Sequence, residues 1–369
     1  MGPVPAAAAS SWAGRSLPDL LDEHGLAGIP EQPFPNDGWS GATLTALDGP
    51  AGRFILKRTS WAADWIARST RDHALREAVL AAEHPALPYP TATAHLGAAA
   101  DGTAAAILMP DLSASLIAWD RPGEAAAIID DETLDRVLFA VATIHAFEWA
   151  SLPGRGEGAV GWPWCPVRER VELLTRSAAL RYQAGGLPVG ERFLAGWDAF
   201  DELAPSPAVD LIAGLAVDSG PLLRALSRLP ATGLHGDLKL ANVALLPDGR
   251  TAFIDWQMAA WAPVAVELGW LLVSNVAQLR QGPDQVLERY RLALATATAA
   301  AGQGAAGSSP DAGNWGAQRD LAILVGLLLR GWRKGLDAAA GESLPTGTAA
   351  ADDLRWWGDE AVEAAKRRL

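Results

Sequence analysis

Two polar motifs joined by a short β-hairpin place the tightest constraint on how this chain can fold. The first motif is residues 235–242 (HGDLKLAN), and the second is residues 253–256 (FIDW). The apolar run 243–246 follows the first motif, and the apolar run 251–254 leads into the second. The typical turn sequence Pro-Asp-Gly-Arg joins the two runs. Pairing of the two runs brings the polar side chains of both motifs to one end of the hairpin.

Those polar side chains are Asp237, Asn242 and Asp255. An Asp and an Asn five residues apart, followed by an Asp after an apolar strand, can place a catalytic base and two metal ligands around a triphosphate. A metal ion that binds phosphate groups prefers such oxygen ligands from the protein. Any one of the three could equally be a turn residue or a helix cap, but the ordered set favours phosphoryl transfer.

In combination the motifs resemble the aminoglycoside phosphotransferase and choline kinase-like family, the small-molecule branch of the protein-kinase fold. The family signature is HGDxxxxN followed by an I/L-D-W/F element, and both occur here in that order. The resemblance implies that Asp237 orients or deprotonates a substrate hydroxyl, and that Asn242 and Asp255 bind Mg²⁺. It implies an α+β, bilobal protein-kinase-like fold. A small β-rich N-terminal lobe with one long helix, residues 1–110, would bind ATP, and a large, mainly helical lobe, residues 111–369, would carry catalysis and substrate binding.

Lys239 stands where members of that family often carry another residue, and the Asp-Leu-Lys run is similar to the catalytic loop of Ser/Thr protein kinases. By that similarity Lys239 would contact the transferring phosphate; otherwise it is a solvated loop lysine. The spacing argues against a protein kinase, because only residues 256–266 separate Asp255 from Glu267, which leaves no room for a peptide-docking segment. Glu267 itself is predicted to be a structural acid that bonds backbone amides at a helix start.

A kinase-like fold also requires an N-terminal lysine and its glutamate. Arg53–Lys57 alternates like a strand that ends in a lysine, and residues 60–83 have the apolar spacing of one amphipathic helix. We therefore expect an ion pair between Lys57, on the α- and β-phosphates, and Glu77 of that helix.

Two further segments are candidates for nucleotide contacts. Gly38, Ser40 and Gly41 precede a strand-like run and could offer amides to phosphate oxygens, although an ordinary hairpin turn fits almost as well. The apolar run 104–109 ends at Pro110, which has no amide proton. By resemblance to the family's hinge, the Met109 carbonyl and the Asp111 amide would bond adenine, in a register that could shift by one residue.

Composition sets the outer limits. A formal charge of −13 argues against a nucleic-acid partner and favours a neutral or cationic acceptor. The alternative is that the charge serves only to keep the protein soluble. No apolar run is long enough to span a membrane, and a single cysteine, Cys165, excludes an internal disulfide. We expect a cytoplasmic monomer or weak homodimer that binds neither nucleic acid nor membrane.

The rest of the chain is predicted to be mostly helical. Helical spacing covers residues 131–149, which include a buried structural His145, and recurs over 167–228, while the Ala/Gly/Ser-rich segment 296–313 is predicted to be a loop. Acidic residues near the C-terminus could bind an aminated substrate, by analogy with the aminoglycoside-modifying relatives; they are Asp352, Asp353, Asp359 and Glu360.

The sequence thus predicts an enzyme, an ATP- and Mg²⁺-dependent kinase of a small-molecule hydroxyl, similar to aminoglycoside phosphotransferases. Two alternatives stay open. One is a kinase of a metabolite such as an amino alcohol, a sugar or a nucleoside-like compound, and the other is a catalytically silent nucleotide-binding scaffold of the same fold.

Overall fold

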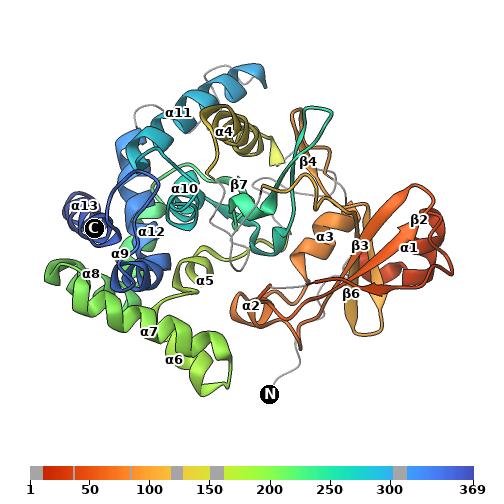
Figure 1. Cartoon of the computed structure of the whole chain (residues 1–369), viewed down its shortest axis with the longest axis horizontal. Helices are drawn as coiled ribbons and strands as arrows, with labels where there is room; N and C mark the ends of the chain where they lie inside the picture. Colours follow the sequence, from red (N-terminus) through yellow and green to blue (C-terminus); the bar gives the residue numbers. More distant parts are fainter. Residues whose placement is uncertain (1–10, 36–37, 84, 118–127, 150–161, 302–313) are drawn as a thin grey trace. The chain divides into compact units, whose positions relative to one another are not determined.

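The computed structural model describes residues 11–35, 38–83, 85–117, 128–149, 162–301 and 314–369 (Figure 1). Contacts divide the chain into two compact units. The N-terminal unit comprises Met1–Ile117, Glu148–Cys165 and Asn242–Ala259, and the helical unit comprises Ala118–Phe147, Pro166–Ala241 and Ala260–Leu369. The sequence suggested a single crossing after residue 110, whereas these contacts group the 243–253 hairpin with the N-terminal strands.

The N-terminal unit is built on a five-stranded antiparallel sheet of order β1-β2-β3-β6-β5. Its strands are β1 (Gln32–Pro33), β2 (Thr43–Gly49), β3 (Gly52–Thr59), β5 (Gly97–Asp101) and β6 (Ala104–Pro110). A second sheet has the order β4-β9-β8 and contains β4 (Thr91–Thr93), β8 (Val243–Leu245) and β9 (Thr251–Phe253). The helices are η1 (Ser11–Gly14), α1 (Leu17–Glu23), α2 (Trp65–Ser69), α3 (Arg76–Glu83) and η5 (Trp256–Met258).

The period-two alternation of β3 decides where Lys57 points. Phe54 and Leu56 pack into the cluster that includes α1, whereas Ile55 packs into the opposite cluster with residues of α3. Successive side chains of a strand point to opposite faces of the sheet. Lys57 therefore leaves β3 on the same side as Ile55, toward the α3 side.

The predicted single helix over residues 60–83 is wrong. The segment contains two short helices, α2 and α3, because the backbone takes left-handed conformations between them, at Arg71 (φ 54°) and Leu75 (φ 53°). Asp64 caps the start of α2 by accepting from the amides of Ile66 at 2.8 Å and Ala67 at 3.1 Å. Helical spacing alone did not reveal this break.

The helical unit surrounds α12, which contacts α7, α10 and α13. Its helices are α4 (Asp131–His145), α5 (Val167–Glu172), α6 (Arg176–Ala184), α7 (Pro188–Leu203), α8 (Ser206–Val217), α9 (Gly220–Leu226), α10 (Val264–Ser274), α11 (Pro283–Ala300), α12 (Trp315–Ala339) and α13 (Ala350–Arg368). Two short strands, β7 (Thr232–Leu234) and β10 (Ala260–Ala262), pair antiparallel. The short helix η4 (Leu240–Asn242) follows at the crossing to the other unit. A small antiparallel sheet with a mainly helical second unit confirms the predicted α+β class.

Other expectations have mixed outcomes. The predicted hairpin forms, as β8 and β9. The helix predicted over 131–149 ends already at His145, and the helical stretch predicted over 167–228 is present as α5 to α9, which end at Leu226. The predicted loop at 296–313 is wrong in its first part, since α11 continues to Ala300, and residues 302–313 lie outside the described residues. Within the described ranges, no helix combines the length and apolar character needed to cross a membrane.

Close packing between α10 and α12 gives a stability prediction. A Cβ on Gly269 would lie 2.4 Å from the carbonyl oxygen of Ala322, on the backbone of α12. Gly269→Ala is therefore expected to lower the free energy of unfolding by about 1–3 kcal/mol, measured by urea denaturation. Gly316→Ala is the control, because its Cβ would meet only a side-chain atom at 3.5 Å. An equal or smaller loss in Gly269→Ala than in the control would contradict the packing argument.

Candidate active site

The predicted site residues fall into the two units. The N-terminal unit holds Gly38, Ser40, Gly41, Lys57, Glu77, Met109, Asp111, Asn242 and Asp255, and the helical unit holds Asp237 and Lys239.

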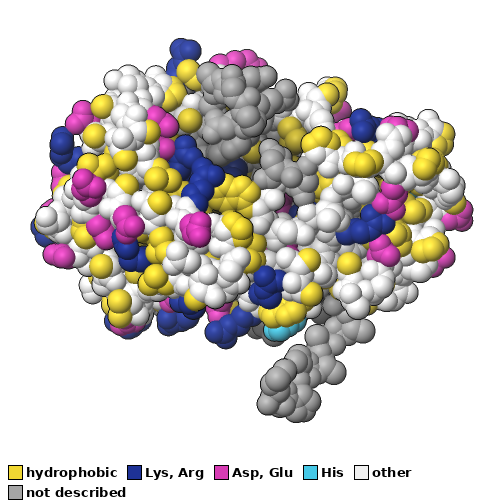
Figure 2. Space-filling model, turned by 60° about the horizontal axis from the view of Figure 1, so that its bottom comes forward, with side chains coloured by type: hydrophobic (Ala, Val, Ile, Leu, Met, Phe, Trp, Pro, Cys, Tyr) yellow, Lys and Arg dark blue, Asp and Glu magenta, His cyan; other side chains and the backbone are white. Residues whose placement is uncertain are grey.

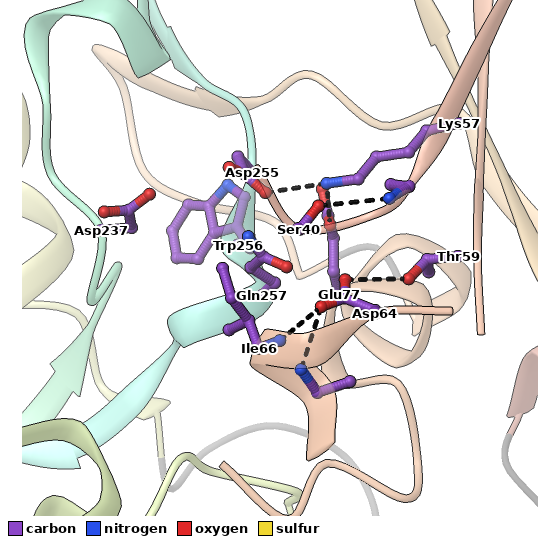
Figure 3. A network of polar contacts seen from close by, with 12 residues as sticks. Ser40, Lys57, Thr59, Asp64, Ile66, Glu77, Asp237, Asp255, Trp256 and Gln257 are labelled. Atoms are coloured by element: carbon purple, nitrogen blue, oxygen red, sulfur yellow. Dashed lines mark hydrogen bonds and ion pairs between the residues drawn. The ribbon is translucent and has the colours of Figure 1, made fainter. Parts of the chain in front are cut away.

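A buried lysine lies at the centre of the N-terminal group (Figure 3). The Nζ atom of Lys57 is 2.6 Å from Oε2 of Glu77 and 2.7 Å from Oδ1 of Asp255. Lys57 is 8% exposed and Glu77 is 2% exposed. The predicted Lys57–Glu77 ion pair is thus present, and it gains Asp255, which the sequence assigned only to metal binding.

The two carboxylates determine the charge state of the lysine. Burial lowers the pKa of Lys57, but Asp255 and Glu77 outweigh that effect and raise it above its usual value. Burial likewise opposes ionisation of Glu77, yet Lys57 and His95 lower its pKa to about 2. The Nε2 atom of His95 lies 3.3 Å from Glu77 Oε1. At neutral pH Lys57 is therefore a fixed cation between two anions.

Asn242 and Asp255 are brought together by the β8–β9 hairpin. Asn242 directly precedes β8, and its carbonyl accepts from the amide of Ile254 at 3.0 Å, so the backbone of the hairpin base is closed next to Asp255. Asp255 has left-handed backbone angles, φ 64° and ψ 58°, which Asp tolerates better than most residues.

The donor set at this position fits Mg²⁺. Asn242 offers an amide oxygen and Asp255 a carboxylate, of which only Oδ1 is recorded in an ion pair with Lys57. Among the described residues no group of three or more His, Cys, Asp or Glu could form a metal site by itself. Mg²⁺ is usually bound by one or two protein oxygens together with substrate phosphates. Two protein ligands are therefore sufficient for a site of this kind.

The loop with Gly38, Ser40 and Gly41 is anchored to α2. The carbonyl of Ser40 accepts from the amide of Trp65 at 3.0 Å. Gly41 has φ +97°, and a Cβ there would lie 2.4 Å from the carbonyl oxygen of Ala63, so only glycine fits. The preceding Asn36 and Asp37 lie outside the described residues. Phosphate binding by this loop stays a prediction.

The hinge prediction needs a correction of register. The amide of Asp111 donates to the carbonyl of Arg53 at 2.9 Å, so it is already used within the sheet. Met109 pairs with Ile55 of β3. Hydrogen-bonded pairs alternate along an antiparallel ladder, so Met109 bonds toward β3 as Asp111 does.

The even-numbered residues of this segment bond on the opposite edge. The carbonyl of Leu108 accepts from Leu96 at 2.8 Å, on the side of β5. β5 begins at Gly97, which pairs with Leu108. The carbonyl of Pro110 and the amide of Leu112 come next on this edge of β6, where β5 no longer pairs with it. The groups directed to this edge are therefore the carbonyl of Pro110 and the amide of Leu112, one residue later than each predicted group.

Arg76, which the sequence analysis did not single out, fixes α3 and hence Glu77. Its Nε donates to the carbonyl of Pro163 at 2.7 Å, and Nη1 donates to the carbonyl of Gln257 at 2.7 Å, two residues after Asp255. Its contact with Thr70 adds a link to the end of α2. The sequence signal was weak, because the acceptors are backbone carbonyls.

In the helical unit, the loop of residues 235–240 is held mainly through its backbone. Glu267, in the first turn of α10, accepts from the amide of Gly236 at 2.5 Å and from that of His235 at 3.1 Å. Arg170 Nε donates to the carbonyl of Gly236 at 2.8 Å, and Asn275 Oδ1 accepts from the amide of Leu240 at 2.9 Å. Glu267 bonds backbone amides, as predicted, but the predicted helix-start role is wrong, because the amides belong to this loop and not to the start of α10.

A histidine and a tyrosine complete the support of Glu267. His145 Nε2 lies 2.8 Å from Glu267 Oε2, and His145 Nδ1 lies 2.6 Å from the hydroxyl of Tyr290. Burial opposes ionisation of Glu267, but His145 and neighbouring donors lower its pKa below the usual value. His145 is buried and structural, as predicted, and it supports the loop through Glu267.

Asp237 and Lys239 form an ion pair on this loop, with Lys239 Nζ 2.9 Å from Asp237 Oδ2. Asp237 is 7% exposed, whereas the Lys239 side chain is 28% exposed. A carboxylate held on a rigid backbone beside a cation is suited to orient a hydroxyl group.

The sequence profile of the Phosphotransferase enzyme family matches residues 31–305, which include every candidate residue above. The chain belongs to this family. This confirms the predicted family and makes the chain a small-molecule phosphotransferase.

Solved structures with similarity to this phosphotransferase include three with low sequence identity. They are the macrolide 2′-phosphotransferase MphH from Brachybacterium faecium (18% identity, 94% of this chain and 96% of that chain, TM-score 0.42), a putative aminoglycoside phosphotransferase from Ralstonia eutropha JMP134 (16%, 95% and 98%, 0.46) and a choline kinase from Cryptosporidium parvum Iowa II (11%, 92% and 88%, 0.47). No curated protein matches the sequence.

The Lys57–Glu77 pair gives a pH prediction. The folded-state pKa of Glu77, about 2, lies below its ordinary value, so its stabilisation is present above about pH 4.5 and is lost as the pH falls toward 2. The wild type should therefore lose on the order of 3 kcal/mol more than Glu77→Gln between pH 7 and pH 2, measured by urea denaturation. Parallel pH profiles of the two proteins would refute this assignment.

Arg76 gives a stability prediction. Arg76→Leu leaves buried carbonyls without a donor and should lower the free energy of unfolding by about 3 kcal/mol or more, measured by chemical denaturation. The control is Arg53→Gln, since the Arg53 side chain is 43% exposed and its ion pairs are long, so its effect should stay within about 0.5 kcal/mol. Similar effects in both variants would contradict the tethering role.

Proposed function

We propose that the protein transfers the γ-phosphate of ATP to a hydroxyl group of a small molecule. The observation that carries the proposal is the buried Lys57 ammonium between Glu77 and Asp255, at 2.6 and 2.7 Å. In phosphotransferases of the kinase type a lysine held by a helix glutamate contacts the α- and β-phosphates, and a nearby Asp binds the metal. The family match supports phosphoryl transfer without specifying the acceptor.

Each residue has a role in the proposed reaction. Lys57 stays charged and provides a fixed positive charge for the phosphates, because Glu77 keeps it in place. Asp237 accepts a hydrogen bond from the acceptor hydroxyl and takes its proton as the oxygen bonds to the γ-phosphorus. The bond from the γ-phosphorus to the β–γ bridging oxygen breaks in the same step, and ADP leaves. Lys239, paired with Asp237, offsets negative charge on the transferring group.

Asn242 and Asp255 would hold Mg²⁺, which when bound neutralises charge on the phosphate oxygens. Binding would place a competing cation beside the carboxylate that Lys57 contacts. The adenine would bond to the carbonyl of Pro110 and the amide of Leu112. Both groups follow on the edge of β6 that pairs with β5, beyond the point where β5 begins. A cytoplasmic location remains a prediction.

The role of Asp237 gives the central test. Asp237→Ala should lower kcat for acceptor-dependent ADP release about 100-fold to 10,000-fold, while Mg-ATP affinity, measured by calorimetry, stays within a few-fold. The control is Asp248→Ala, because Asp248 lies in the exposed hairpin turn and contacts Arg250. The screen covers aminoglycosides, macrolides, amino alcohols, sugars and nucleosides. Failure to bind Mg-ATP would refute the site assignment, and binding without any acceptor use would favour a silent scaffold.

A further inference from the structure

Helix α12 departs from helical geometry at one residue, Arg330, where φ is −135° and ψ is 18°. The guanidinium carbon of Arg330 lies 5.4 Å from the ring centroid of Trp270 and 5.6 Å from that of Trp332. Contact with aromatic faces stabilises a cation but does not neutralise its charge. The two aromatic contacts thus hold the Arg330 guanidinium in place without neutralising its positive charge.

Arg330 has no ion pair among the described residues, in contrast to its neighbours on α12. Its Nη1 atom donates to Ser274 Oγ at 3.3 Å, and its Nε atom is buried without a partner. Nearby, Arg333 pairs with Asp337 at 2.7 Å, and Lys334 pairs with Asp353 at 2.5 Å. Arg330 as a whole is half-buried, and within the described part of the chain its guanidinium has no ion-pair partner that an incoming anion would have to displace.

The position of Arg330 connects it to the catalytic loop. Trp270 contacts Arg330 and also Arg170, whose guanidinium carbon lies 4.7 Å from the same ring. Arg170 in turn donates to the carbonyl of Gly236, the residue before Asp237. Burial and Arg333 lower the pKa of Arg330 to about 10, and the negative charges of Asp337 and Asp237 oppose that lowering, so Arg330 remains cationic at neutral pH.

The acidic residues expected to bind an aminated substrate are mostly neutralised. Asp352 pairs with Arg355 at 2.9 Å, Asp353 with Lys334, and Glu360 with Arg319 at 2.9 Å. On the face drawn in Figure 2, acidic and basic side chains are interspersed. The charge of −13 therefore does not by itself supply a site for a cationic group.

We propose that Arg330 is a specificity-determining residue that binds an oxyanion of the acceptor, so that the preferred substrate is a hydroxylated carboxylate or phosphate. This rests on the proposed phosphotransferase function and adds the chemical class of the acceptor. A guanidinium with no carboxylate of its own gains most from such a group, because charge-assisted hydrogen bonds to oxyanions are strong and geometrically selective.

The test uses sets of acceptors that share hydroxyl groups and differ in charge. One set is glucuronate, glucose and glucosamine, and the other is glycerate, glycerol phosphate, glycerol and aminopropanediol. In acceptor-dependent ADP release, the wild type should show its highest kcat/KM with an anionic member. Arg330→Gln should reduce that kcat/KM about 10-fold to 100-fold and leave the neutral members within about 3-fold of the wild type.

The matched control is Arg333→Gln, one helical turn away, whose arginine already has a carboxylate partner. It should change kcat/KM for the anions less than about 3-fold, and Arg330→Lys should retain part of the preference because it keeps the charge. A preference for the amines, equal losses in Arg330→Gln and Arg333→Gln, or no use of any anion by a protein that binds Mg-ATP would overturn the proposal. Failure to bind Mg-ATP would instead refute the proposed function itself.

Discussion

The burial of one ammonium group between two carboxylates is the constraint on which the N-terminal unit depends. A buried cation is costly unless it is paired and hydrogen-bonded, so Lys57 needs both Glu77 and Asp255. That need fixes which face of β3 points to α3, and it requires the strand β9 to end where it does. The tether from Arg76 to the backbone beyond Asp255 then joins these elements without relying on the nucleotide.

In the helical unit a buried carboxylate has the corresponding structural role, with backbone amides as its partners. Glu267 holds two successive amides of the loop before Asp237, and His145 holds Glu267. The conformation of this loop therefore depends mainly on contacts of its backbone. The same unit thus combines a rigid support for Asp237 with the cation Arg330, which forms no ion pair with any of the described residues.

The sequence predicted the elements that depend on short-range patterns. The strand of Lys57 and the β8–β9 hairpin follow from alternation and turn chemistry. Motif spacing identified Glu267 as a structural acid but not the loop whose amides it binds. The break between α2 and α3 did not follow, because left-handed residues such as Arg71 have no reliable sequence signal. The hinge register depends on which strand edge bonds β3, and the exposure of Arg330 depends on aromatic contacts from α10, both of which are properties of tertiary structure.

Glycines on both sides of Arg330 have an evolutionary consequence. Gly326 approaches α10, and Gly331 approaches the aromatic rings of α7, each so closely that an added Cβ would lie 2.9 Å from the nearest atom. The backbone that carries position 330 is thereby fixed by neighbours other than the arginine itself. If Arg330 binds the acceptor as proposed, relatives can differ in acceptor preference by exchange of that single side chain while the backbone packing around it is retained.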